Sequence, residues 1–124
     1  MISFEEAIQI HGLLIQKFGG STGLRDPESL KSALARPYQT FEDQNLYPTP
    51  EEKAAAILES VITNHPFIDG NKRLGFVLMK LILLEVDLSL SATYDEVYNF
   101  IIQVARGEHD TTSITKWIKF HVAH

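Results

Sequence analysis

The residues of this chain that could do chemistry are concentrated in one nine-residue stretch, His65-Pro66-Phe67-Ile68-Asp69-Gly70-Asn71-Lys72-Arg73. It places an imidazole, a carboxylate, an amide and two cations directly before a long apolar segment. The first turn of a helix favours anions, because its backbone N–H groups are unpaired and its macrodipole is positive there. Lys72 and Arg73 oppose that preference, at a typical cost of ~0.3–1 kcal/mol each. A bound anion such as a phosphate group would remove the conflict.

Four residues of this stretch could form a phosphate site at the start of a helix. Gly70 permits a tight turn that brings the backbone close to a ligand, and Asn71 could cap the helix. The N–H groups of the turn could then hold phosphates whose charge Lys72 and Arg73 neutralise. Alternatively, the two cations are solvated surface residues, because their cost at a helix start is small.

Three further residues complete the candidate site. Asp69 could hold a Mg²⁺ ion that bridges phosphate oxygens, or it could instead pair with Arg73 or cap the helix. His65, placed at the end of the preceding helix by Pro66, could take a proton from an incoming hydroxyl, or it could be structural. Phe67 is expected to point inward and to anchor the loop in the core under either interpretation.

Helix signals lie on both sides of this loop. N-cap residues precede five segments of helical periodicity, at Ser3, Asp26, Thr49, Thr93 and either Thr111 or Thr112. Glycine or proline signals end four segments, at Gly19-Gly20, Pro37, Pro66 and Gly107. A further segment, residues 74–86, is apolar nearly all the way round, which is typical of a helix in the middle of a bundle.

Strand signals are few, and only residues 87–92 alternate in a way that suggests a short strand. The pattern therefore predicts an all-α fold: a compact bundle of about six helices, with a central buried helix after the 65–73 loop. We expect one domain covering residues 1–124.

Two features outside the loop leave alternatives open. Residues 37–48 have no clear period and carry three aromatic side chains, so they predict a loop or short flap that is stapled to the body or holds a substrate segment. His11 is interpreted as structural or partner-facing rather than catalytic, because nothing beside it in the sequence suggests a task. The remaining histidines lack metal-ligand spacing and are interpreted as solvated: His109, His121 and His124.

Composition narrows the classes of function. The absence of cysteine excludes disulfides, thiolate metal sites and cysteine nucleophiles, and the net charge of −5 disfavours binding to polymeric nucleic acid. The most apolar stretch is interrupted by Lys80 and is shorter than the roughly 20 residues needed to cross a membrane. The N-terminus lacks the pattern of a secretory signal. We therefore expect a cytoplasmic protein without a membrane partner.

The 65–73 stretch resembles the signature of the Fic superfamily, H-x-F-x-[D/E]-G-N-x-R, in the form found in death-on-curing (Doc) toxins. Every defining position of the signature is filled. The similarity extends to three other stretches common in Doc-like proteins: Gly23-Leu24-Arg25-Asp26-Pro27, Ala35-Arg36-Pro37 and Leu46-Tyr47-Pro48.

This resemblance implies a Fic fold that binds ATP and Mg²⁺, with specific roles for the loop residues. His65 would be the general base, Asp69 the Mg²⁺ ligand and Phe67 the structural anchor. The residues around the nucleotide phosphates would be Gly70, Asn71, Lys72 and Arg73.

The resemblance also implies a reaction. Lys72 stands where AMP-transferring Fic enzymes usually have glycine, and Phe76 where they usually have a second arginine. Both departures indicate the Doc branch, whose members are toxins that transfer the γ-phosphate of ATP to a threonine of elongation factor Tu and so arrest translation. The alternatives are Fic-type AMP transfer to a protein hydroxyl and a non-catalytic Fic-fold binding module. A metal-dependent hydrolase is disfavoured, because His65 and Asp69 are too few ligands.

Control of such an enzyme is expected to come from another chain. Many Fic proteins carry an inhibitory helix with the pattern [S/T]-x-x-x-E-[G/N], and no Ser or Thr of this sequence has Glu four residues later. The resemblance implies a cognate antitoxin, whose C-terminal segment is disordered alone and folds into a groove on the toxin. The sequence does not locate the groove; the helix carrying His11 and the region of Arg25 are candidates.

Overall fold

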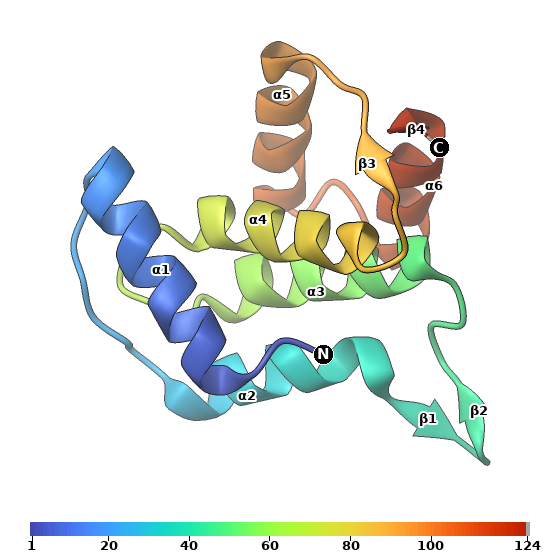
Figure 1. Ribbon diagram of the computed structural model, residues 1–124, viewed down its shortest axis with the longest axis horizontal. Helices are drawn as coiled ribbons and strands as arrows, with labels where there is room; N and C mark the ends of the chain where they lie inside the picture. The colour runs from blue at the N-terminus through green and yellow to red at the C-terminus, as the bar shows by residue number, and fades with distance from the viewer. Residues whose placement is uncertain (124) are drawn as a thin grey trace.

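Six α-helices make up most of residues 1–123, the part of the chain that the computed structural model describes (Figure 1). Their bounds are α1 Phe4–Phe18, α2 Pro27–Ala35, α3 Pro50–Asn64, α4 Asn71–Leu84, α5 Tyr94–Ala105 and α6 Thr111–His121. A 3₁₀ turn, η1 Arg36–Tyr38, continues α2. The prediction of an all-α fold with about six helices is confirmed.

Two short antiparallel strand pairs complete the fold. Strand β1 (Thr40–Phe41) pairs with β2 (Gln44–Asn45), and β3 (Ser89–Leu90) pairs with β4 (Val122–Ala123). The strand expected within residues 87–92 is therefore present. Its partner β4 directly follows the C-terminal end of α6, and those two residues gave no strand signal in the sequence.

Most helix ends are where the cap residues predicted them. The side chains of Ser3, Asp26, Thr49 and Thr93 each accept a hydrogen bond from the backbone N–H three residues later. The cap predicted for α6 at Thr111 or Thr112 is wrong. Asp110 caps that helix through the backbone N–H of Ser113, in a reciprocal capping box. Asp is at least as good an N-cap as Thr, so it prevails one residue earlier.

Helix α3 lies between the other elements and packs against α2, α4, α5 and α6 (Figure 1). It buries Ala54, Ala55, Ala56, Ile57, Leu58, Ser60, Val61 and Ile62. Gly75 lets α4 approach closely, because a Cβ there would lie 3.3 Å from a methyl carbon of Leu58. Helix α4 buries one face, whereas its outer face is half-buried or exposed; Leu84 is 52% exposed. None of the helices within residues 1–123 is long and apolar enough to cross a membrane.

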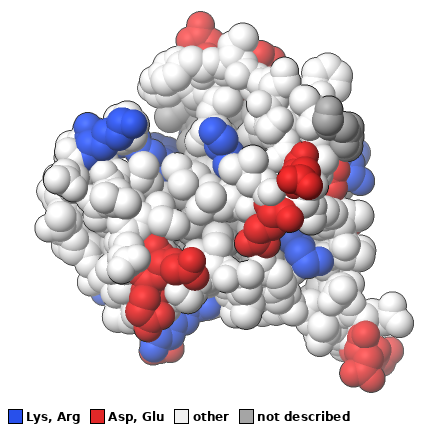
Figure 2. All heavy atoms as spheres, in the orientation of Figure 1, with Lys and Arg blue, Asp and Glu red and all other residues white. Residues whose placement is uncertain are grey.

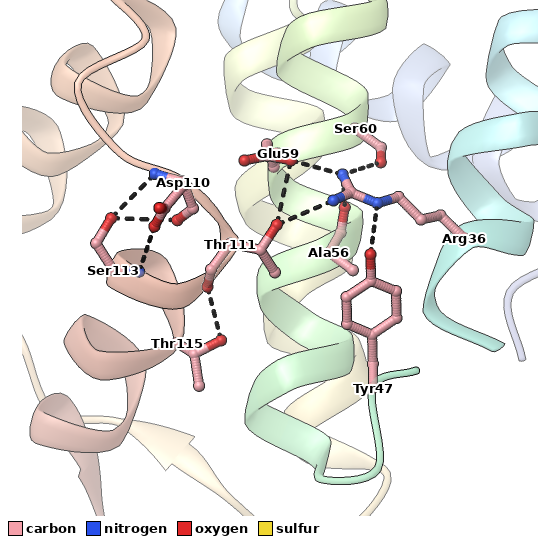
Figure 3. A network of polar contacts seen from close by, with 9 residues as sticks. All are labelled: Arg36, Tyr47, Ala56, Glu59, Ser60, Asp110, Thr111, Ser113 and Thr115. Atoms are coloured by element: carbon pink, nitrogen blue, oxygen red, sulfur yellow. Dashed lines mark hydrogen bonds and ion pairs between the residues drawn. The ribbon is translucent and has the colours of Figure 1, made fainter. Parts of the chain in front are cut away.

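Arg36 links four segments of the fold through one polar network (Figure 3). Its guanidinium donates hydrogen bonds to the Glu59 carboxylate (2.7 Å), the Ser60 hydroxyl (2.8 Å), the Thr111 hydroxyl (2.9 Å) and the Tyr47 hydroxyl (3.1 Å). Burial opposes the guanidinium charge, but the bonds to Glu59 and Tyr47 outweigh it and raise the pKa of Arg36. Tyr47 therefore staples the end of the 37–48 segment to the body, one of the two roles expected for it.

Replacing Arg36 with alanine is expected to lower the free energy of unfolding by about 2–3 kcal/mol. The change removes several charge-assisted hydrogen bonds and leaves a partly buried carboxylate unpaired. Urea denaturation of the variant measures this loss. Arg106→Ala is the matched control, because this exposed arginine makes no side-chain hydrogen bond within residues 1–123, and its removal should change stability by no more than about 0.5 kcal/mol. Equal stabilities of the two variants would contradict the assigned role.

The interpretation of His109 and His121 as solvated is wrong. The ring nitrogens of His109 lie 3.0 Å from the Ser113 hydroxyl and 2.8 Å from the Gln103 side-chain oxygen. His121 stacks on Trp117 and lies 3.1 Å from a carboxylate oxygen of Glu96. Both rings thus pack between α5 and α6, a contact that spacing along the sequence does not reveal. His124 lies outside the described residues.

Candidate active site

His65 follows directly on the last residue of α3. Pro66 disfavours helical geometry in the residue before it, and α3 accordingly ends at Asn64. His65 adopts left-handed backbone angles (φ 53°, ψ 55°), which typically cost about 1–2 kcal/mol for a residue other than glycine. Its imidazole is exposed and makes no hydrogen bond to any residue of the described chain. The ring is therefore free to act on a ligand.

Arg25 holds the end of α3 in place. Its guanidinium donates to the carbonyl oxygens of Asn64 and His65, each at 2.8 Å. Its backbone N–H and that of Asp26 both donate to the Pro66 carbonyl. A cation at a helix C-terminus also complements the macrodipole. The 23–27 stretch, which resembles Doc-like proteins, thus has a structural role: it fixes the backbone that carries His65.

The side chains of Phe67 and His11 are buried beneath the 65–73 loop and stack on each other. Phe67 is 2% exposed, and the His11 ring stacks on it with centroids 3.7 Å apart. His11 is 3% exposed, and its Nε2 donates to the Asp69 carbonyl at 2.8 Å. Of the two interpretations of His11, the structural one is confirmed and the partner-facing one is wrong. A sequence signal existed: His11 is four residues from both Ala7 and Ile15, which are buried on the same face of α1.

Asn71 is the first residue of α4, so it does not cap the helix as expected. Gly70 occupies the N-cap position with positive φ. The Asn71 amide instead reaches back to Phe67, accepting from its N–H (3.0 Å) and donating to its carbonyl (2.8 Å). Because the side-chain amide is occupied, Asn71 could contact a phosphate only through its backbone N–H. Sequence reasoning missed this role, because asparagine suits both a helix cap and a side chain that bonds to the preceding backbone. The residue type therefore does not distinguish the two.

The start of α4 has the free donors of an anion site. No side chain caps it, and the backbone N–H groups of Asn71, Lys72 and Arg73 find no acceptor within residues 1–123. Gly70 is required here, because its φ is +79° and a Cβ would lie 3.2 Å from Ile15. The side chains of Lys72 and Arg73 are exposed beside these donors.

Asp69 is fixed by two backbone donors. Its carboxylate oxygens accept from the N–H of Ser21 at 3.1 Å and from that of Gly70 at 2.8 Å. These two bonds, with help from the charges of Arg73 and His11, lower the pKa of Asp69 below its ordinary value. No ion pair joins Asp69 to Arg73 among the described residues. The absence of a side chain at Gly20 leaves room for this carboxylate, because a Cβ there would lie 2.7 Å from an Asp69 oxygen.

The donor set fits Mg²⁺ only together with phosphate oxygens. No group of three or more His, Asp or Glu side chains that could hold a metal ion occurs within residues 1–123. Mg²⁺ keeps several waters and is commonly held by one or two carboxylates plus substrate phosphates. Asp69 beside the start of α4 matches that second arrangement.

These groups face one cleft of about 430 Å³. Its lining comprises Ile62, His65, Ile68, Asp69, Gly70, Asn71, Lys72, Arg73 and Ala105. The structure therefore brings together every residue proposed for proton, metal or phosphate contact, with Phe67 beneath them. The β1–β2 hairpin does not line the cleft. It precedes α3, whose 15 residues span about 22 Å, and the cleft lies at the C-terminal end of that helix.

An apolar groove of about 480 Å³ lies beside the cleft, between α1, α4 and α5. It is lined by Leu14, Phe18, Lys72, Arg73, Phe76, Val77, Tyr94, Val97, Tyr98, Ile101 and Ile102. Lys72 and Arg73 border both the cleft and this groove. They form a shared ridge between an anion site and an apolar surface.

Comparison with known proteins shows which family and which relative the chain is similar to. A family model described as the Fic/DOC family matches residues 1–83, which include the whole 65–73 loop. The chain is 35% identical over 99 residues to the protein called Toxin Doc of Mycolicibacterium smegmatis (strain ATCC 700084 / mc(2)155). That alignment covers 78% of this chain and 76% of the relative.

Proposed function

This chain belongs to the Fic/DOC family, and from that premise we propose that it is the toxin of a toxin–antitoxin pair and acts as a protein kinase. Its substrate would be a threonine hydroxyl, on elongation factor Tu by resemblance to the Doc branch. The observation that supports this most is the convergence of His65, Asp69 and the uncapped start of α4 on one cleft. An unhindered imidazole beside an anion site suits proton removal next to a phosphoryl group.

Each group would have a defined task in the transfer. The N–H groups of residues 71–73 and the cations of Lys72 and Arg73 would hold the phosphates of ATP. Asp69 would hold Mg²⁺, which neutralises charge on the phosphate oxygens when it is bound. The His65 imidazole would take the threonine proton. The threonine oxygen would then bond to the γ-phosphorus as the bond from that phosphorus to the ADP oxygen breaks.

Two residues favour kinase activity over AMP transfer. Lys72 adds charge and bulk at the position where AMP-transferring relatives usually have glycine, which is compatible with a different arrangement of the phosphates. Phe76 lines the apolar groove and supplies no second cation to the cleft. The same cleft would serve the alternative reaction, in which AMP is transferred.

Isotope labelling separates the two reactions. The protein is incubated with Mg²⁺, elongation factor Tu and ATP labelled on either the γ- or the α-phosphate. We expect label in elongation factor Tu only from γ-labelled ATP. Transfer of the α label would replace the kinase proposal by AMP transfer. No transfer of either label, while the protein still binds nucleotide, would favour the non-catalytic module.

We place the antitoxin segment in the apolar groove between α1, α4 and α5. The helix carrying His11, one of the two regions suggested by the sequence, contributes Leu14 and Phe18 to this groove, although His11 itself is buried on another face of the helix. The other region is occupied by internal contacts, because the Arg25 guanidinium bonds to α3. The groove offers exposed aromatic surface, with Tyr98 54% exposed, and two cations at its border. An amphipathic helix with an acidic end would complement it in both polarity and charge.

Replacing Tyr98 with glutamate is expected to weaken binding of the cognate antitoxin at least about tenfold. The variant puts a charge into an apolar contact and repels an acidic helix. Titration calorimetry with the antitoxin measures the change. The matched control is Phe120→Glu on α6, an exposed aromatic that does not line the groove. Equal losses in the two variants, or none in Tyr98→Glu, would move the antitoxin away from this groove.

A further inference from the structure

Phe18 is the last residue of α1 and lies under the side chain of Arg73. The guanidinium carbon of Arg73 is 4.4 Å from the centroid of the Phe18 ring, which is the distance of a cation–π contact. Phe18 is 53% exposed, so burial in the core does not explain a large aromatic side chain here. Gly19 ends α1 immediately afterwards.

Among residues 1–123, the Phe18 ring is the one aromatic side chain in a cation–π contact with the Arg73 guanidinium. Arg25 and Arg36 are each held by hydrogen bonds to several oxygens, whereas Arg73 forms neither a hydrogen bond nor an ion pair within that range. A free arginine side chain samples many rotamers, and ordering it on binding costs conformational entropy. The contact with Phe18 reduces that cost before a ligand arrives.

A cation–π contact leaves the hydrogen-bond donors of an arginine available. An aromatic ring engages the face of a guanidinium, and all five N–H donors lie in the guanidinium plane. The donors therefore remain available for two parallel hydrogen bonds to a phosphate. The position of Arg73 on the ridge between cleft and groove places those donors beside the start of α4.

We propose that Phe18 is a positioning residue that holds Arg73 ready for the phosphates of the nucleotide. This inference rests on the proposed function. The end of α1 then orients two of the three charged side chains of the cleft: the Phe18 ring holds Arg73, and three residues later the Ser21 N–H holds Asp69. Phe18 also lines the groove, so a partner bound there contacts the residue that positions Arg73.

A double-mutant cycle tests the proposal, with Mg²⁺ and a non-hydrolysable ATP analogue as the ligand in titration calorimetry. Phe18→Leu is expected to raise Kd about two- to fivefold, the range that corresponds to a solvent-exposed cation–π contact. Phe18→Tyr, which keeps an aromatic ring, should bind like the wild type. In an Arg73→Gln background, Phe18→Leu should have no further effect. Leu13→Ala, an exposed apolar side chain on α1, is the control.

The outcomes separate this inference from the proposed function. An equal loss from Phe18→Leu in both backgrounds would mean that Phe18 acts through the fold and would overturn the proposal. Wild-type affinity in Phe18→Leu would overturn it as well, while leaving the proposed function standing. If the wild-type protein binds no nucleotide, the proposed function fails and this inference fails with it.

Discussion

Replacing His65 with asparagine is expected to lower the rate of phosphate transfer about 100- to 10,000-fold, the usual contribution of a general base. Asparagine is the sharpest replacement, because it tolerates the left-handed backbone that His65 adopts, whereas alanine tolerates it less well. The amide cannot accept a proton at neutral pH. A fall in rate would therefore result from the loss of the general base and not from a change in the loop conformation.

The contacts of His65 explain why this substitution should leave the fold intact. The imidazole makes no hydrogen bond within residues 1–123, while the backbone that carries it is held by Arg25. We expect the free energy of unfolding to change by less than about 0.5 kcal/mol, as for other exposed sites. Affinity for the nucleotide analogue should also stay close to that of the wild type. Transfer at the wild-type rate by His65→Asn would show that another group removes the proton.

How far the sequence could predict this site depends on the range of each signal. Caps and prolines act within three or four residues, so the start of α3 at Thr49-Pro50 and its end before Pro66 could be read directly. The loop residues converge on one cleft because they are also neighbours in the sequence. The resemblance added their roles, which periodicity alone does not supply.

Contacts between distant segments were beyond such reasoning. The bond between His11 and Asp69 joins residues 58 positions apart, and the bond between Arg36 and Thr111 joins residues 75 positions apart. Nothing local to either residue names its partner, since these contacts arise only when the helices pack. The groove beside α4 has the same origin, because it is formed by side chains of three helices.

The β1–β2 hairpin is a further case: the local sequence predicted a loop or flap but not where it lies relative to the cleft. Its turn residues, Glu42 and Asp43, both have positive φ, which is uncommon for residues other than glycine. Figure 2 shows acidic side chains at this end of the molecule, away from the start of α4. The alternative that this segment holds a substrate at the cleft finds no support in its position.

Replacing Asp69 with asparagine is expected to abolish measurable transfer and to weaken binding of the Mg²⁺–nucleotide analogue more than tenfold. The change keeps the size of the side chain and removes the charge that a Mg²⁺ ion requires. The amide also has a single acceptor oxygen, and its NH₂ group would face one of the two N–H donors that hold the carboxylate. Asp69→Glu is the matched control, because it keeps the charge and the signature accepts either acid.

The pH dependence of the loop gives this prediction an independent readout. The pKa of Asp69 is lowered in the folded protein, so the two bonds stabilise the fold fully above the ordinary pKa of aspartate, about 3.9. That contribution is lost as the pH falls through the lowered value. The amide NMR signals of Ser21 and Gly70 should therefore titrate with a midpoint below pH ~3.9 in the wild type and not titrate in Asp69→Asn. A midpoint above that value would mean that the two donors do not stabilise the charged carboxylate. Wild-type transfer by Asp69→Asn would remove Asp69 from the proposed Mg²⁺ site.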